Sequence, residues 1–318
     1  MANVYLVKNK EQRVQGGHPW VFRSDIESVE GAHVPGGVVR VMSSRHKFLG
    51  MAVYNPQSQI SLRMLSRRDE SINSAWIHSR VKRAIDYRRH FADLKSCRLI
   101  FAESDGLPAV IADAFGDVIV LQVLCLGMEG FKQDIVDALV EELHPKGIWE
   151  RSDVPVRELE GMEQVTGLLY GEVPDKIEMV ENGVHFWVDV KEGQKTGFFL
   201  DQKENRAAIA PFVKDARVLD CFTHTGSFAL HAGHFGAKEV IGVDISDLPA
   251  NAPPKMRVST ALKTPCALNA LTLLTTCAPP RMRMNSLTWS SLTRPPLPKP
   301  APPWRARCAA TRRSTCAA

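Results

Sequence analysis

Acidic residues are absent from the last part of this sequence. All 35 Asp and Glu residues lie before position 248, whereas residues 248–318 carry 11 Lys and Arg and no acid. The same 71 residues contain no Gly, Phe, Tyr, Ile, His or Gln, and they hold 12 of the 20 prolines. Ordinary folded domains draw about a quarter of their residues from the four charged types, of both signs. The net charge of +5 therefore combines a slightly acidic larger part with a strongly basic tail.

Long apolar runs and paired cysteines are also missing. The sequence contains no run of about 18 apolar residues, which is the length that a membrane-spanning helix needs. The N-terminus shows no signal-peptide pattern. We therefore expect a cytoplasmic protein without membrane contact. The seven cysteines show no C-x-x-C spacing, which argues against a metal site and against a disulfide framework.

One stretch, residues 217–244, has the pattern of a strand, a tight loop, a helix and a second strand. The two apolar runs end in Asp220 and Asp244, and the loop between them closes on Gly226. In open parallel sheets, ligands bind beyond the carboxyl ends of the strands, where loop N–H groups are exposed. The loop lacks the G-x-G-x-x-G pattern, so a dinucleotide would fit poorly. An ordinary β-α-β unit with a glycine turn is the alternative.

The run D-C-F-T-H-T-G-S-F, which begins at Asp220, resembles the first motif of class I S-adenosylmethionine (SAM) methyltransferases. The resemblance implies that the first acid and the glycine loop border the methionine part of SAM, and that the second acid holds the ribose. A further segment, G-Q-K-T-G-F-F-L-D-Q at 193–202, follows a strong hairpin signal at Asn182-Gly183. It resembles an element that helps to line the cofactor pocket in a bacterial ribosomal RNA methyltransferase family. The cofactor-binding residues implied are Lys195, Phe198, Asp220, Phe222, Thr223, Thr225, Gly226, Ser227 and Asp244.

Residues 1–70 have the pattern of a small β-rich unit, with strand-like runs at 4–7, 38–42, 48–54 and 60–65. The segment G-G-H-P-W-V-F-R at 16–23 allows two interpretations of Trp20: an exposed ring that stacks on bases, or a ring that closes a small barrel. This segment and G-M-A-V-Y-N-P at 50–56 resemble the N-terminal PUA domain of a bacterial ribosomal RNA methyltransferase family. The resemblance implies RNA contact, which we expect through Arg13, His18, Trp20 and Arg23.

Residues 71–180 predict a mixed α+β linking domain. A basic amphipathic helix is expected at 71–90, where the charges indicate a solvated face or, as the minority interpretation, part of an RNA surface. Strand-like runs at 99–101, 109–113 and 118–123 precede a helix with apolar residues spaced by four over 131–143. The segments 103–113 and 150–153 again resemble that family's linking domain, and we expect their acids to be structural.

Two hypotheses account for the tail: a disordered basic segment that binds nucleic acid, or translation in the wrong reading frame. When the codons of L-T-W-S-S-L-T-R-P-P-L-P-K, residues 287–299, are displaced by one base, a consistent DNA sequence spells F-D-V-V-I-L-D-P-P-A-F-T-K. That phrase is an apolar strand ending in Asp-Pro-Pro, and it resembles the fourth methyltransferase motif, which borders the target base. The sequence favours a frameshift near Asp247, which would leave one edge of the sheet unpaired.

Together these patterns predict an α/β chain with four parts. They are a PUA-like β-barrel (1–70), an α+β linking domain (71–180), the first part of a Rossmann-like SAM-methyltransferase domain (181–246) and an irregular, out-of-frame tail (247–318). The resemblance implies a SAM-dependent enzyme that forms 5-methylcytosine in large-subunit ribosomal RNA, with a homodimer as a further expectation. The alternative is a non-catalytic RNA-binding protein that uses the PUA-like domain and the basic tail.

Methylation at C5 of cytosine needs a thiolate that adds to C6 of the base. In the family the resemblance indicates, this cysteine follows the Asp-Pro-Pro motif, beyond the end of this chain. Cys221 is interpreted as a small packing residue within the cofactor loop. The sequence therefore assigns no catalytic residue, and it predicts that the chain as written is inactive.

Overall fold

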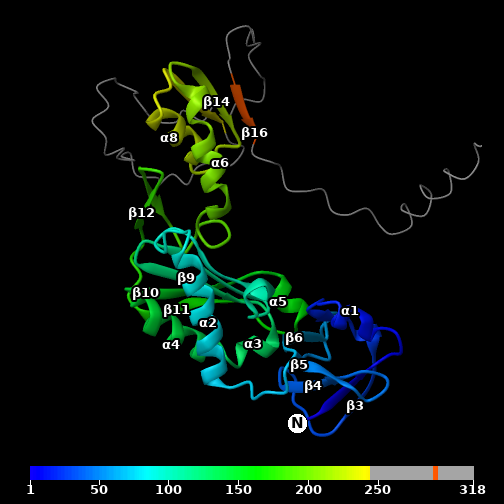
Figure 1. The fold of residues 1–318 in the computed structure, drawn as a ribbon. Coiled ribbons are helices and arrows are strands. Elements are labelled where there is room, and N and C mark those ends of the chain that lie inside the picture. The colour runs from blue at the N-terminus through cyan, green and yellow to red at the C-terminus, as the bar shows by residue number, and fades with distance from the viewer. Residues whose placement is uncertain (244–288, 293–318) are drawn as a thin grey trace, which may run out of the picture. The chain divides into compact units, whose positions relative to one another are not determined.

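The computed structural model describes residues 1–243 and 289–292, which fall into two compact units (Figure 1). The first unit is Met1–Ala207, and the second begins at Ala208. Both units combine helices with β-sheets, so the expected α/β class is confirmed. Among the residues described, no helix combines the length and the apolar character that crossing a bilayer requires.

The N-terminal part of the first unit is a six-stranded sheet in the order β2-β6-β5-β4-β1-β3. β1 pairs in parallel with β4, and the other pairs are antiparallel. Alternate residues of β1 and β4 are fully buried, as the period of two in a strand requires. The strands are β1 (Asn3–Leu6), β2 (Trp20–Val21), β3 (Ile26–Glu30), β4 (Val38–Met42), β5 (Phe48–Tyr54) and β6 (Leu62–Ser66), with α1 (Glu11–Gln15) and η1 (Arg23–Asp25) between them.

The linking region is a five-stranded sheet in the order β11-β10-β9-β8-β7, with α2 (Ser74–Arg89) and α4 (Lys132–Leu143) packed against each other. The Asn73 side chain caps α2 by accepting from the backbone N–H of Trp76. Residues from α2, α4 and the sheet share one large apolar core. The remaining elements are β7 (Arg98–Phe101), η2 (Ala102–Asp105), β8 (Val110–Phe115), β9 (Val118–Val123), α3 (Leu126–Glu129), β10 (Gly147–Ser152), α5 (Val156–Leu159) and β11 (Val165–Gly171).

A hairpin of β12 (Ile177–Glu181) and β13 (Val184–Val188) completes the first unit, with η3 (Leu200–Gln202) and α6 (Lys203–Ala208) after it. The turn has φ of +52° at Asn182 and +80° at Gly183, as the Asn-Gly sequence predicts. Arg206 is 1% exposed and donates to both carboxylate oxygens of Glu181, at 2.5 and 2.9 Å. This buried pair fixes α6 on the hairpin. The domain boundary expected at 180/181 falls inside β12.

The second unit contains a parallel sheet in the order β15-β14-β16. Its described elements are α7 (Ala210–Val213), β14 (Arg217–Cys221), α8 (Ser227–His234), β15 (Glu239–Val243) and β16 (Trp289–Leu292). β16 lies in the segment for which we expected irregular structure. It pairs with β14 from Val218↔Trp289 to Cys221↔Leu292, so this edge of β14 has a neighbour.

Candidate functional site: the loop after β14

The loop between β14 and α8 has an unusual backbone. Phe222, His224 and Gly226 have φ of +62°, +50° and +77°, in the left-handed region. This region is costly for residues with a Cβ, and such strain is concentrated at ligand sites. Alternation of left-handed and right-handed residues turns successive backbone N–H groups toward one side, which forms a concavity for anionic groups. Gly226 is also the N-cap of α8, and the first N–H groups of this helix add to the positive potential of the concavity.

Asp220 holds this loop from inside. Its side chain is 1% exposed, and Oδ2 accepts from the Thr223 hydroxyl at 2.6 Å and from the Ala229 backbone N–H at 3.1 Å. The carboxylate therefore connects the end of β14 to the loop and to the first turn of α8. Gly242 in β15 packs close to the same threonine, because a Cβ at Gly242 would lie 3.1 Å from Thr223. Asp220 therefore stabilises the conformation of the loop and is not part of its exposed surface.

The structure brings together most of the residues that the sequence predicts for the cofactor. Phe222 is 50% exposed, Thr225 and Ser227 are half-buried, and Thr223 and Gly226 are buried in the same loop. Asp244 lies outside the described residues. Lys195 and Phe198 belong to the first unit, whereas the loop belongs to the second.

The segment that carries Lys195 and Phe198 is anchored within the first unit. The Thr196 hydroxyl donates to Asp113 Oδ2 at 2.7 Å, and Arg151 Nη1 donates to the carbonyls of Val190 and Gly193 at 2.9 and 3.0 Å. A Cβ at Gly193 would lie 2.2 Å from the Asp189 carbonyl, so only glycine fits this tight turn.

Of these two side chains, one is buried and one is exposed. Phe198 is 5% exposed; its ring packs on Phe186 at 5.1 Å and lies under the Arg206 guanidinium at 4.7 Å. Lys195 is exposed, with Nζ 4.5 Å from the centre of the Phe199 ring. The sequence pattern marked the segment correctly as unusual, but it could not distinguish the packing phenylalanine from a surface one.

The acids of the linking region are paired, as expected. Asp113 accepts from Arg98 at 2.8 and 3.0 Å as well as from Thr196. Lys132 and Arg157 donate to Glu129, and although burial opposes ionisation, these bonds hold the pKa of Glu129 below its usual value. Such pairs are structural. The sequence did not reveal that Asp113 and Arg151 position the segment around Thr196, since each partner lies far away in the chain.

The four residues expected to contact RNA have partners within the first unit. Trp20 is half-buried rather than exposed, and its indole Nε1 donates to Glu103 at 2.7 Å. The guanidinium of Arg63 lies 5.8 Å from the centre of the same indole ring. The structure therefore places the indole partly buried, with η2 over its polar edge, and contact of this ring with RNA stays a prediction.

The cations of the same group are more accessible. Arg13 and Arg23 are exposed; Arg13 lies 3.8 Å from Asp25 and 5.1 Å from the Phe22 ring centre, and Arg23 donates to the Gln57 carbonyl. His18 is half-buried, and its Nδ1 bonds the backbone of Trp20.

The three described cysteines are free thiols. Burial raises the pKa of Cys97 to about 11 and that of Cys125 to about 12, so neither forms a thiolate near neutral pH. Cys221 is half-buried at the end of β14. Within residues 1–243 and 289–292, no group of three His, Cys, Asp or Glu side chains could hold a metal ion.

Two family models match the chain. Residues 4–67 match that of the PUA-like domain, and residues 158–259 match that of the S-adenosylmethionine-dependent methyltransferase. The second match contains the whole loop after β14. The presence of both domains was expected from the sequence and is confirmed.

Curated relatives share extensive identity with this chain. "Ribosomal RNA large subunit methyltransferase I" of Vibrio parahaemolyticus is 45% identical over 249 residues, which cover 77% of this chain and 63% of the relative. The protein of the same name from Pseudoalteromonas atlantica is 42% identical over 251 residues, with 78% and 64% covered. The chain thus spans a little under two thirds of the length of these relatives.

Solved structures support the fold. A Streptococcus mutans protein assigned to the SAM-dependent methyltransferases matches with a TM-score of 0.65 and 24% identity, over 78% of this chain and 64% of that one. The methyltransferase SMU.776, solved with SAH, matches with a TM-score of 0.66 and 23% identity, over 78% and 63%. At these identities the likeness concerns the fold alone.

Proposed function

We propose that the chain belongs to the family of SAM-dependent ribosomal RNA large subunit methyltransferases, with which it aligns over most of its length, and that it serves to methylate C5 of a cytosine in large-subunit ribosomal RNA. The observation that carries the proposal is the backbone of the loop after β14. Three left-handed residues follow a strand end, and a buried carboxylate holds them there. An ordinary β-α-β turn would not need this strain.

The loop suits SAM chemically. SAM carries a carboxylate and an ammonium on its methionine part, ribose hydroxyls and a sulfonium that supplies the methyl group. The loop N–H groups between Phe222 and Ser227 and the start of α8 would hold the carboxylate, and the exposed Phe222 would cover one side. Asp220 would keep those N–H groups aligned. We assign the ribose to Asp244, and we place Lys195 beside the cofactor as a surface cation.

RNA contact forms the second part of the proposal. Arg13 and Arg23 are exposed cations of the PUA-like domain and would bind phosphates, with His18 and Trp20 shaping the segment between them. The affinity should then fall as the salt concentration rises. We further propose that the protein works in the cytoplasm, where ribosomal RNA is modified, and that it forms a homodimer.

The reading frame is the third part. β16 lies in a parallel sheet, where strands are usually near-continuous apolar runs, yet its printed sequence is Trp-Ser-Ser-Leu. Displacement by one base moves the first base of each printed codon to the middle of a new one. The codon for Trp begins with T, and so does one group of the codons for Ser and one group of those for Leu. Every codon with a central T encodes Phe, Leu, Ile, Met or Val. The displaced frame therefore makes the position of Trp289 apolar, and it makes the other three strand positions apolar when their Ser and Leu codons begin with T.

The displaced reading frame also suits the pairing of β16 with β14. The displaced sequence, Val-Val-Ile-Leu followed by Asp-Pro-Pro, gives β14 an apolar parallel neighbour. The match to the methyltransferase model ends at residue 259 and leaves 260–318 beyond it. We therefore propose that the sequence leaves its natural frame near Asp247, and that the frame-corrected chain contains the Asp-Pro-Pro motif and the cysteine nucleophile expected after it.

The test compares the printed chain with a chain corrected by one base near codon 247. Both receive tritiated SAM and large-subunit ribosomal RNA, and digested RNA is analysed for 5-methylcytidine. We expect 5-methylcytidine from the corrected chain and background counts from the printed one. Robust transfer by the printed chain would refute the frame proposal. No transfer by a folded, corrected chain would refute the methyltransferase proposal and favour the non-catalytic RNA-binding alternative.

A further inference from the structure

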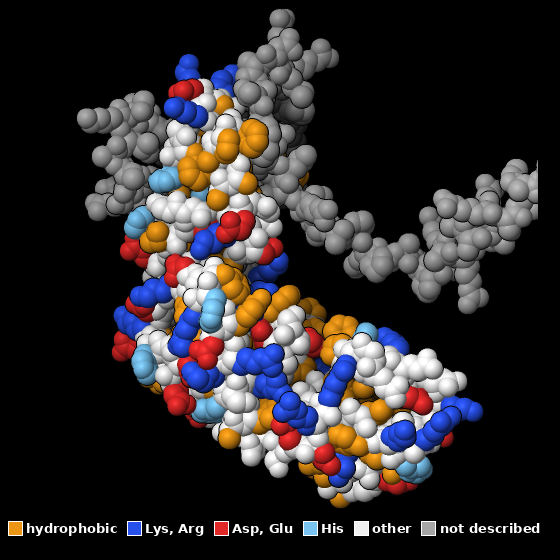
Figure 2. All heavy atoms as spheres, viewed as in Figure 1, with side chains coloured by type: hydrophobic (Ala, Val, Ile, Leu, Met, Phe, Trp, Pro, Cys, Tyr) orange, Lys and Arg blue, Asp and Glu red, His pale blue; other side chains and the backbone are white. Residues whose placement is uncertain are grey.

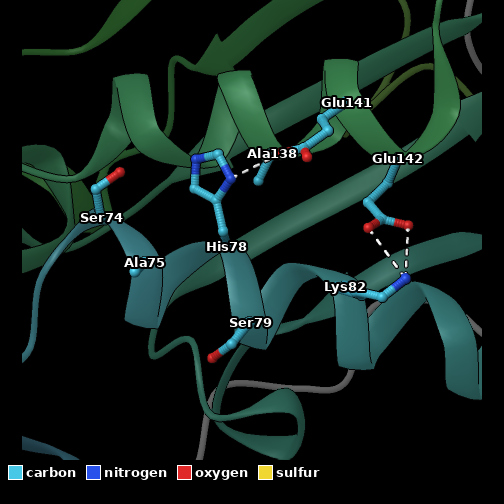
Figure 3. A pocket seen from close by; sticks show the side chains of 8 residues that line it. All are labelled: Ser74, Ala75, His78, Ser79, Lys82, Ala138, Glu141 and Glu142. Atoms are coloured by element: carbon cyan, nitrogen blue, oxygen red, sulfur yellow. Dashed lines mark hydrogen bonds and ion pairs between the residues drawn. The ribbon is translucent and has the colours of Figure 1, made fainter.

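The long helix α2 has two faces with different charge environments. One face meets α4: His78 Nδ1 lies 3.0 Å from Glu141 Oε2, and Lys82 Nζ lies 3.2 Å from Glu142 Oε1 (Figure 3). Arg89 also lies on this side, 3.5 Å from Glu142. The positive charges of this face are therefore neutralised by acids of α4.

The opposite face carries arginines and aromatic rings. Trp76, Arg80, Arg83 and Tyr87 follow one another at spacings of three and four, so they form one stripe along the helix. The guanidinium of Arg80 lies 4.6 Å from the centre of the Trp76 ring. Figure 2 shows Lys and Arg side chains gathered where α2 approaches the N-terminal sheet.

Two large aromatic side chains continue this stripe into solvent. Tyr87 and Phe91 are each 65% exposed, and their rings meet edge to face with centroids 4.9 Å apart. Exposed aromatic pairs are unusual, because burying such rings normally stabilises the fold. Neither ring belongs to the apolar core of the linking region.

Positive charge on this face is not balanced. Glu70 Oε1 lies 4.0 Å from Arg80, but the same oxygen accepts from the Ser66 hydroxyl and from Trp76 Nε1. Among the described residues, no acid pairs with Arg83. Burial lowers the pKa of Arg80, and the nearby charge of Arg83 and, more weakly, of Arg68 lowers it further. Arg83 and Arg68 thus both lie close enough to Arg80 to act on its charge, and Glu70 opposes them only in part.

We propose that Arg68, Arg80, Arg83, Tyr87 and Phe91 form a binding face for a single-stranded segment of RNA. This inference rests on the proposed function, since it assigns a second contact to the same substrate. The arginines bind successive phosphates, and the Tyr87–Phe91 pair stacks on a base. Single-stranded RNA fits because its bases are free to stack, whereas those of a duplex are covered by their neighbours. A duplex would use the arginines alone.

The experiment measures binding of the full frame-corrected chain to a fluorescent single-stranded oligoribonucleotide of about 12 nucleotides and to the matching duplex. Arg83→Ala and Tyr87→Ala test the face. Lys82→Ala is the matched control, because it removes one positive charge from the same helix on the face that α4 neutralises. All three side chains are exposed, so thermal unfolding should be unchanged.

We expect Arg83→Ala to weaken binding of the single strand and to reduce the slope of log affinity against log salt by about one. Tyr87→Ala should weaken it about tenfold and spare the duplex. Lys82→Ala should change neither. Equal effects of Arg83→Ala and Lys82→Ala, or no effect of Tyr87→Ala, would overturn the proposal, and an unaffected RNA affinity would indicate a protein partner for the face. Because no methyl transfer is measured, failure here is distinct from failure of the proposed reaction.

Discussion

Two polar clusters of this protein are built in opposite ways. The loop after β14 is local: Asp220, Thr223 and Ala229 lie within ten residues of sequence and satisfy one another. The cluster between the N-terminal sheet and the linking region joins distant segments. There, Arg63 donates to Glu160 at 3.0 Å and to Glu103 at 3.2 Å.

The second cluster is centred on one buried acid. Glu160 is 3% exposed and accepts from Arg63, from the Ser58 hydroxyl at 2.6 Å and from Asn55 Nδ2 at 3.0 Å. Trp20 joins it through Glu103. A local cluster can form a ligand site on one loop, whereas a cluster from four segments holds two parts of a fold together. We call this second group the junction cluster: Trp20, Asn55, Ser58, Arg63, Glu103 and Glu160.

The largest effect should follow from removing the central acid of the junction cluster. Glu160→Ala leaves buried Arg63 with one acid fewer and the Ser58 hydroxyl without its acceptor, while Asn55 keeps only its bond to the backbone carbonyl of residue 160. Loss of one partner of a buried ion pair costs about 3–5 kcal/mol. We expect the free energy of unfolding in urea to fall by that amount.

The control for this change is Asp69→Ala. Asp69 pairs with Arg40 at 2.7 Å, but the two side chains are 55% and 38% exposed. Exposed pairs contribute about 0–1 kcal/mol. If Glu160→Ala costs no more than Asp69→Ala, the junction cluster does not hold the two parts together.

A smaller effect should come from Trp20→Phe, which keeps a ring and removes the indole N–H. Glu103 would lose one donor and keep Arg63, so we expect the free energy of unfolding to fall by about 1–2 kcal/mol. RNA affinity should change less than about twofold if the indole stabilises the fold and does not contact RNA. The substitution thus distinguishes a residue of the junction cluster from a ligand-binding residue. Lower RNA affinity with unchanged thermal unfolding would indicate that Trp20 contacts RNA.

The contrast explains what could be predicted from the sequence. The strand, loop and helix around D-C-F-T-H-T-G-S-F were predicted correctly because their pattern lies in consecutive residues, and the hairpin because Asn-Gly tolerates positive φ. The sequence could not decide between the two interpretations of Trp20, because its partner Glu103 lies 83 residues away and no local pattern indicates it. The burial of Phe198 was missed for the same reason, since Arg206 and Phe186 cover it.

Charge on α2 shows the same limit. Composition alone marked Arg80, Lys82, Arg83, Arg88 and Arg89 as one basic group. In the fold, Arg88 is buried and pairs with Asp105 at 2.8 Å, and α4 neutralises two more. Only packing between elements distinguishes the cations that remain available for a partner.

The most direct test of the account is amide hydrogen exchange of the frame-corrected chain with and without SAH, alongside the variant Asp220→Asn. The amides of 221–231 should gain protection on SAH addition in the parent chain, because their N–H groups would hold the ligand, and those of 16–23 should not change. Asp220→Asn should lose most of that gain, since a neutral amide is a weaker acceptor for Thr223 and Ala229. Protection confined to other segments, or an equal gain in the Asp220→Asn chain, would contradict the assignment of the SAM site to this loop.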